Sequence, residues 1–134
     1  MVCYASHGGS GIVATELGQA LAARGHEVHF ITSDVPVRMD RFRENIFFHR
    51  VEVDDYPVFQ HTPYALNLAV KILDVIKSRE LDVIHAHYAV PHATSAYLAK
   101  QMWRPCDVRT VTTLHGTDIT LVGVKPSFYE ITRF

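Results

Sequence analysis

The chain has 134 residues, the length of one ordinary domain, and 48% of them are hydrophobic, which is typical of a globular protein. A net charge of −1 gives no electrostatic reason to expect nucleic acid or an anionic membrane as a partner. No apolar run approaches the roughly 20 residues of a membrane span, so we expect neither a span nor a signal peptide. The two cysteines, Cys3 and Cys106, form no disulfide or metal-binding pattern, which fits a reducing, cytoplasmic setting.

Strand patterns and helix patterns alternate along the chain. Apolar or β-branched runs predict strands at 2–5, 27–32, 46–53, 82–87 and 108–114. Apolar residues at helical spacing predict helices at 11–24, from about 66 to 79, at 91–102 and from 127 onward. This alternation predicts an α/β fold, a Rossmann-like parallel sheet with helices on both faces.

Both ends of the chain lead to a further expectation. The first strand begins almost at Met1 and has only about four residues, where strands usually run about five or six. The last helical pattern starts near Ser127 and reaches Phe134 without a cap. We therefore expect residues 1–134 to be a domain truncated at both ends.

A glycine-rich turn lies between the first strand and the first helix. Gly8, Gly9 and Gly11 would let backbone N–H groups approach an anion, and the helix N-terminus adds partial positive charge. Ser10 would either cap the helix or donate its hydroxyl to a ligand. The turn matches neither the dinucleotide fingerprint nor the P-loop, and a turn needed only for tight packing is the alternative.

Three polar segments follow predicted strands: the glycine turn, residues 85–88 and residues 112–118. In open parallel sheets, ligands bind at the carboxyl ends of the strands. The three segments therefore predict a binding site at that edge of the sheet.

Histidines gather in these segments. His85 and His87 are two apart on a strand, so their side chains share a face, and with His92 or His115 they could ligate zinc. No cysteine or carboxylate completes a familiar ligand set, and a strand histidine facing a helix is usually a hydrogen-bonded core residue, so we expect no metal site. The remaining histidines are expected to be structural or exposed: His7, His26, His29, His49 and His61.

Other polar residues at this edge each have two interpretations. His115 would hydrogen-bond a ligand hydroxyl or carry a proton, or else order its loop through a backbone carbonyl. Tyr88 would close over a small ligand or pack under the next helix. Asp118 is expected to steady the loop. Thr112 and Thr113 are adjacent on a strand, so at most one of them faces the cleft.

Taken together, residues 8–17, 85–92 and 112–120 resemble the N-terminal half of the family-4 retaining glycosyltransferases, which have the GT-B fold. Residues 30–33 and 97–102 agree as well, so the resemblance covers nearly the whole chain. Within the family, the chain is similar to the members that act in bacillithiol biosynthesis.

The resemblance implies transfer of N-acetylglucosamine from UDP-N-acetylglucosamine to the hydroxyl of L-malate, with retained configuration and with no cofactor or metal. In that family the N-terminal domain mainly binds the acceptor, and the C-terminal domain holds the nucleotide sugar. The C-terminal domain, with its Glu-x7-Glu segment, is absent from this sequence, so we expect the chain alone to be inactive. A homo-oligomer of the full-length enzyme is left open.

The family's functional residues carry over by position. The Gly8–Gly9 turn would approach the donor diphosphate, and Ser10, Tyr88 and Thr113 would contact malate. His115 matches the family histidine that bonds the donor sugar near the reacting centre, and it is the expected catalytic residue. Two alternatives stay open: a family-4 transferase with a sugar or lipid acceptor, and a non-catalytic module that binds an anion or a sugar.

Overall fold

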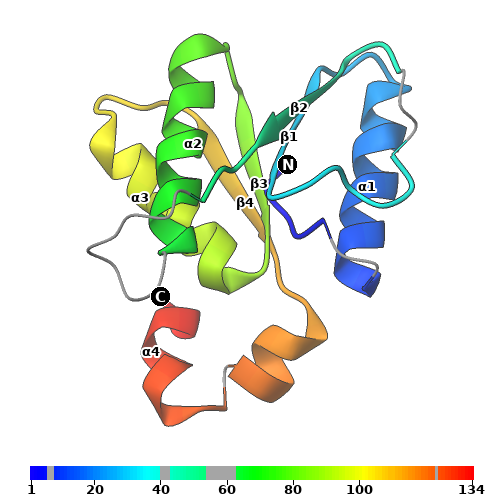
Figure 1. Ribbon diagram of the computed structural model, residues 1–134. Helices are drawn as coiled ribbons and strands as arrows, with labels where there is room; N and C mark the ends of the chain where they lie inside the picture. The colour runs from blue at the N-terminus through cyan, green and yellow to red at the C-terminus, as the bar shows by residue number, and fades with distance from the viewer. Residues whose placement is uncertain (6–7, 40–42, 54–62, 123) are drawn as a thin grey trace.

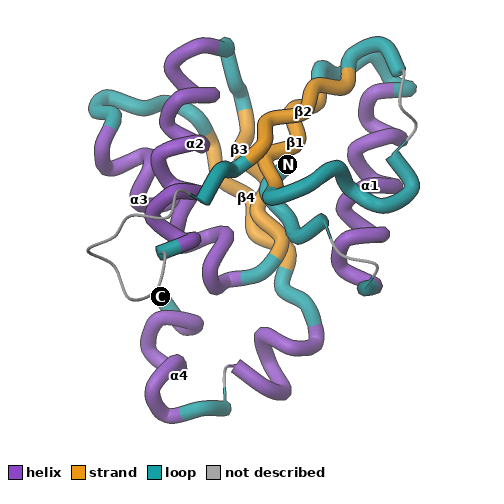
Figure 2. The backbone as a smooth tube through the Cα atoms, viewed as in Figure 1, coloured by secondary structure: helices purple, strands orange, loops and turns teal. Residues whose placement is uncertain are grey.

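A computed structural model describes residues 1–5, 8–39, 43–53, 63–122 and 124–134. The expectations for His7 and His61 lie outside the described residues. Strands and helices alternate along the chain, as Figures 1 and 2 show. The elements are α1 (Gly9–Ala22), β1 (Val28–Thr32), β2 (Ile46–Arg50), α2 (Tyr64–Ser78), β3 (Val83–His87), η1 (Ala89–Ala93), α3 (Thr94–Met102), β4 (Arg109–Thr113), η2 (Asp118–Val122) and α4 (Pro126–Arg133).

The four strands in the described part of the chain form two parallel pairs. β1 pairs with β2, and β3 pairs with β4, each over five residues. Val2 lies between the pairs and forms parallel bridges with Ile31 of β1 and with Ala86 of β3. The order across the sheet is therefore β2, β1, the Val2 segment, β3 and β4.

Backbone hydrogen bonds hold the Val2 segment in the middle of the sheet. The Val2 N–H donates to the His85 carbonyl at 2.8 Å, and the His87 N–H donates to the Val2 carbonyl at 2.9 Å. On the other side, the Ile31 N–H donates to the Met1 carbonyl at 2.9 Å. These bonds make one sheet out of two pairs.

The expected strand at 2–5 is wrong in extent, because only Val2 forms bridges. The chain then leaves the sheet toward the start of α1, and the ring of Tyr4 packs edge-on against the ring of His92 at 4.4 Å. A strand in the middle of a sheet needs hydrogen-bonded strands on both sides, and this segment has them only at Val2.

The other expected elements are present, with boundaries shifted by one to three residues. The expected strand at 46–53 ends at Arg50, and the first helix occupies 9–22 instead of 11–24. The helix expected at 91–102 is present, and a π-helical turn, η1, precedes it and continues into α3. Val90 has extended backbone angles (φ −121°, ψ 128°), as expected for a residue before proline.

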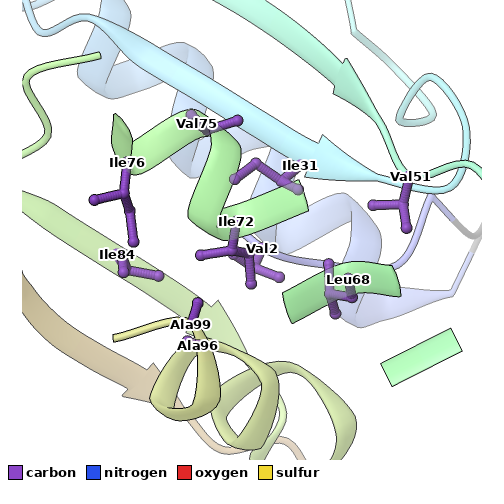
Figure 3. Packing of buried hydrophobic residues seen from close by; sticks show 10 residues of the cluster. All are labelled: Val2, Ile31, Val51, Leu68, Ile72, Val75, Ile76, Ile84, Ala96 and Ala99. Carbon is purple, nitrogen blue, oxygen red and sulfur yellow. The ribbon is translucent and has the colours of Figure 1, made fainter. Parts of the chain in front are cut away.

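Helices cover both faces of the sheet, which confirms the expected α/β fold. α1 packs on one face over a core that contains Cys3, Val28 and Phe30. α2 and α3 pack on the other face, where Ile72 and Ile84 belong to the larger cluster (Figure 3). None of the helices in the described part of the chain combines the length and apolar character needed to cross a bilayer.

Two histidines outside the expected site have structural hydrogen bonds. His29 is 5% exposed, and its Nε2–H donates to the Glu27 carboxylate at 2.7 Å. On the other side of the ring, Nδ1 of His29 lies 2.8 Å from Nε2 of His49. The expectation of structural roles for His29 and His49 is confirmed.

The contact between α1 and β1 predicts the effect of one substitution. A Cβ at Gly18 would lie 2.3 Å from Cζ of Phe30, whose side chain is fully buried. We expect Gly18→Ala to lower the free energy of unfolding by about 1–3 kcal/mol, although alanine favours helices. Urea unfolding of the purified chain measures this change.

Two further variants control that experiment. Gly18→Ala combined with Phe30→Leu should recover part of the loss, because the shorter side chain makes room. Gly9→Ala adds a methyl that has no atom of the described segments within 4 Å and should not create a clash. A Gly18→Ala protein as stable as the parent would contradict the packing described.

Candidate active site

Three segments that are distant in sequence meet beyond the carboxyl ends of β3 and β4. Ser10 lies in the first turn of α1, Tyr88 directly follows β3, and His115 follows β4. The Tyr88 hydroxyl donates to Ser10 Oγ at 2.8 Å, and the Tyr88 and His115 rings are 4.7 Å apart. The structure therefore brings together three residues that the sequence placed at this edge. We call Ser10, Tyr88, Thr113 and His115 the edge cluster.

The glycine turn places Ser10 inside α1. Gly8 has extended backbone angles (φ −72°, ψ 161°) and is the N-cap, with no side-chain capping bond. The expectation that Ser10 could cap the helix is therefore wrong, and its hydroxyl lies against Tyr88 instead. The first-turn amides have no acceptor within the helix, and an added Cβ on Gly9 meets no atom of the described residues within 4 Å. The turn is thus open to an anion.

Tyr88 is held in an unusual backbone conformation. Its φ of +85° is in the left-handed region, which side chains other than glycine seldom adopt. Its N–H donates to the Thr113 carbonyl at 3.0 Å, and its ring contacts Tyr4 and His115. Such strain costs about 1–3 kcal/mol and persists only where the surroundings enforce it. The half-buried phenol is therefore positioned by both neighbouring segments.

His85 and His87 lie on one face of β3, as expected from their spacing. The rings of His85 and His87 stack at 4.6 Å, which confirms that they share a face. His85 Nε2 is 2.7 Å from the Thr113 hydroxyl, and His87 Nδ1 is 3.1 Å from His115 Nε2. Thr113 thus faces the histidines, whereas Thr112 lines a cavity on the other face.

No group of three or more His, Cys, Asp or Glu side chains is arranged to hold a metal ion in the described ranges. His92 forms a hydrogen bond instead, since its Nδ1–H donates to the His87 carbonyl. Its ring is fully buried, and Nε2 has no hydrogen-bond partner among the described residues. The sequence suggested His92 only as a metal ligand, and nothing in its spacing indicated this backbone bond.

Burial lowers the pKa of three histidines near this edge of the sheet, His85, His87 and His92. It lowers the pKa of His87 and of His92 from 6.5 to about 4, because a charged ring would lose its hydration. Burial also lowers the pKa of His85. The fully buried rings of His87 and His92 are therefore neutral at pH 7.

Asp118 links the segment that follows β3 to the segment that follows β4. Its carboxylate is fully buried, and its two oxygens accept from the Ala89 N–H at 3.1 Å and the His115 N–H at 2.9 Å. The expectation that Asp118 steadies its loop is confirmed. The bond to Ala89 was not expected, because residue spacing says nothing about a partner on another loop.

A cavity of about 690 Å³ lies apart from the edge cluster. It is lined by α3, β4 and the C-terminal helix, including Tyr97, Thr112 and Phe134. Because it contains none of the edge cluster, it does not enter the chemistry of this site.

Removing the Asp118 carboxylate should destabilise the segments that follow β3 and β4. We expect Asp118→Ala to lower the free energy of unfolding by about 2–4 kcal/mol, because two backbone N–H groups lose their acceptor. Asp118→Asn keeps one oxygen acceptor and should cost less. Chemical unfolding compares the variants, and equal stability of Asp118→Ala and the parent would contradict the role of the carboxylate.

The buried histidines predict a pH dependence of stability. With lowered pKa values, the folded chain binds fewer protons than the unfolded chain between about pH 4 and 6.5. Stability should be full above pH 6.5 and fall as the pH drops toward 4, by about 3 kcal/mol or more in total.

Urea unfolding at a series of pH values measures this slope. His92→Leu should flatten it, because one of the two buried rings no longer titrates, whereas His26→Asn alters an exposed residue and should leave it unchanged. Constant stability from pH 7 to pH 5 would show that the two rings are not held neutral.

Comparison with known proteins agrees with the resemblance. The family model described as Glycosyltransferase Family 4 matches residues 7–134. The N-acetyl-alpha-D-glucosaminyl L-malate synthase of Bacillus anthracis is 54% identical over all 134 residues of the chain. The chain spans 35% of the length of that relative. With the parallel sheet and the cluster at its carboxyl edge, these matches show that the chain belongs to glycosyltransferase family 4.

Proposed function

We propose that the chain is the acceptor-binding, N-terminal part of a retaining glycosyltransferase of bacillithiol biosynthesis. The reaction is transfer of N-acetylglucosamine from UDP-N-acetylglucosamine to L-malate. The observation that carries the proposal is the 54% identity to the Bacillus anthracis relative over the entire chain. Since the chain spans about a third of that relative, the domain that holds the nucleotide sugar is proposed to lie outside these residues. The setting is proposed to be the cytoplasm.

The chemistry of the edge cluster suits a small dicarboxylate. The N-terminus of α1 attracts negative charge, and its first-turn amides are available as donors. Because Ser10 Oγ accepts the hydrogen of the Tyr88 hydroxyl, its own hydrogen remains to donate to a carboxylate. Thr113 adds a hydroxyl beside His85. Malate is therefore proposed to bind among Ser10, Tyr88 and Thr113.

The donor is proposed to approach from the same side. The open space beside Gly9 admits a diphosphate close to the backbone at the start of α1. His115 is proposed to hydrogen-bond the donor sugar, with its backbone held by Asp118. Catalysis would then come from the orientation of the two substrates and from stabilisation of the leaving diphosphate.

A chimera tests the proposal. Residues 1–134 replace the matching segment of the Bacillus anthracis relative, and UDP release is followed with L-malate as acceptor. We expect transfer, with the α configuration of the product visible by NMR, and no UDP release by the isolated chain. Ser10→Ala and Thr113→Val should each lower kcat/KM for malate roughly 10- to 100-fold, as expected for a hydrogen bond to a charged group.

Thr112→Val is the matched control, because Thr112 is adjacent to Thr113 but lines the cavity on the other face, so it should leave kcat/KM unchanged. Transfer to a sugar but not to malate would assign another acceptor of the family. Malate binding by a folded chimera without transfer would favour a binding module. UDP release above background by the isolated chain would contradict its proposed inactivity.

A further inference from the structure

His87 has no role in the proposed chemistry, yet it contacts the proposed catalytic histidine. Its ring is fully buried, and its Nδ1 is 3.1 Å from His115 Nε2. The other ring nitrogen, Nε2, is buried and has no hydrogen-bond partner among the described residues. The hydrogen between the two rings can lie on either nitrogen, so its placement has to be argued.

The unpartnered nitrogen decides between the two placements. If His115 donated, neutral His87 would carry its hydrogen on Nε2, where none of the described residues offers an acceptor. If His87 donates from Nδ1, only a lone pair is left unpartnered at Nε2. A buried N–H without an acceptor is the rarer and costlier arrangement. The hydrogen therefore belongs on His87 Nδ1, and His115 accepts at Nε2.

The groups around His87 agree with a neutral ring that carries its hydrogen on Nδ1. The carbonyl of His87 accepts the Nδ1–H of His92, which orients that ring and leaves its Nε2 as a lone pair. On the other side, the ring of His85 stacks on His87 at 4.6 Å. Burial lowers the pKa of His87 to about 4, which agrees with a neutral ring. Neither neighbouring histidine is hydrogen-bonded to His87 Nε2.

We propose that His87 is a positioning residue that holds His115 as the neutral tautomer with its hydrogen on Nδ1. The two nitrogens of an imidazole point in diverging directions, so the Nδ1–H of His115 is directed away from His87. In the described part of the chain this Nδ1 has no hydrogen-bond partner, so it is left to donate to an oxygen of a ligand. The use of this donor on a sugar oxygen rests on the proposed function, whereas the tautomer itself does not.

Ring nitrogen spectra of the ¹⁵N-labelled chain test the tautomer directly. Long-range ¹H–¹⁵N correlations at pH 7.5 distinguish a protonated Nδ1 from a protonated Nε2, and the His115 signals are assigned by their loss in His115→Gln. We expect His115 to show a protonated Nδ1 and an unprotonated Nε2. The reverse pattern in the parent chain would overturn the proposal.

Two substitutions at His87 separate positioning from a merely structural role. His87→Leu removes the donor and should shift His115 toward the Nε2–H form, whereas His87→Asn keeps an amide donor near the Nδ1 position and should restore the Nδ1–H form. His49→Asn, which alters a bond to His29 elsewhere in the sheet, should leave the His115 signals unchanged. An Nδ1–H pattern retained in a folded His87→Leu chain would also overturn the proposal. If His87→Leu does not fold, His87→Asn and the parent chain decide the result.

The chimera keeps this inference separate from the proposed function. There, His87→Leu should lower kcat by about tenfold or more, with a smaller change in KM for malate, and His87→Asn should recover part of the loss. An inactive chimera combined with the expected ring spectra would remove the proposed function and leave the tautomer assignment standing.

Discussion

The backbone hydrogen bonds of Met1 and Val2 join the two halves of the sheet, since Met1 accepts from Ile31 of β1 and Val2 bonds to His85 and His87 of β3. Without them, the β1–β2 and β3–β4 pairs would share no strand contacts. Val2 bonds to the end of β3, the strand that Tyr88 directly follows, and the Tyr88 hydroxyl in turn donates to Ser10 in the first turn of α1. The apolar side chain of Val2, fully buried in the larger core cluster, keeps its backbone bonds away from competing water.

The site is built from neutral donors around one buried charge. Asp118 holds two backbone amides, so its carboxylate is compensated by hydrogen bonds that the fold itself supplies. The buried histidines next to it are neutral, because burial lowers the pKa of each. Hydroxyls and amides are left as the groups that can meet an anion. The proposed binding of a dicarboxylate and a diphosphate at this site would therefore place no buried cation against them.

Most of the fold could be predicted because its information is local. The apolar periodicity of α2 and the β-branched run of β4 each determine an element with no reference to the rest of the chain. The exceptions have non-local causes. The strand expected at 2–5 is reduced to Val2, because only this residue forms bridges to β1 and β3. Ser10 lies inside α1 because Gly8 adopts the extended N-cap conformation.

The sequence by itself determined the order of the elements, the parallel sheet, and the edge at which Ser10, Tyr88 and His115 gather. This was accessible because each of the three segments follows a predicted strand, and the carboxyl ends of parallel strands lie at one edge of a sheet. Only the tertiary structure decided the hydrogen-bond partners: Tyr88 with Ser10, 78 residues away, and His87 with His115, 28 residues away. Spacing tells which face a side chain takes, but the atom that it meets depends on how separate elements pack together.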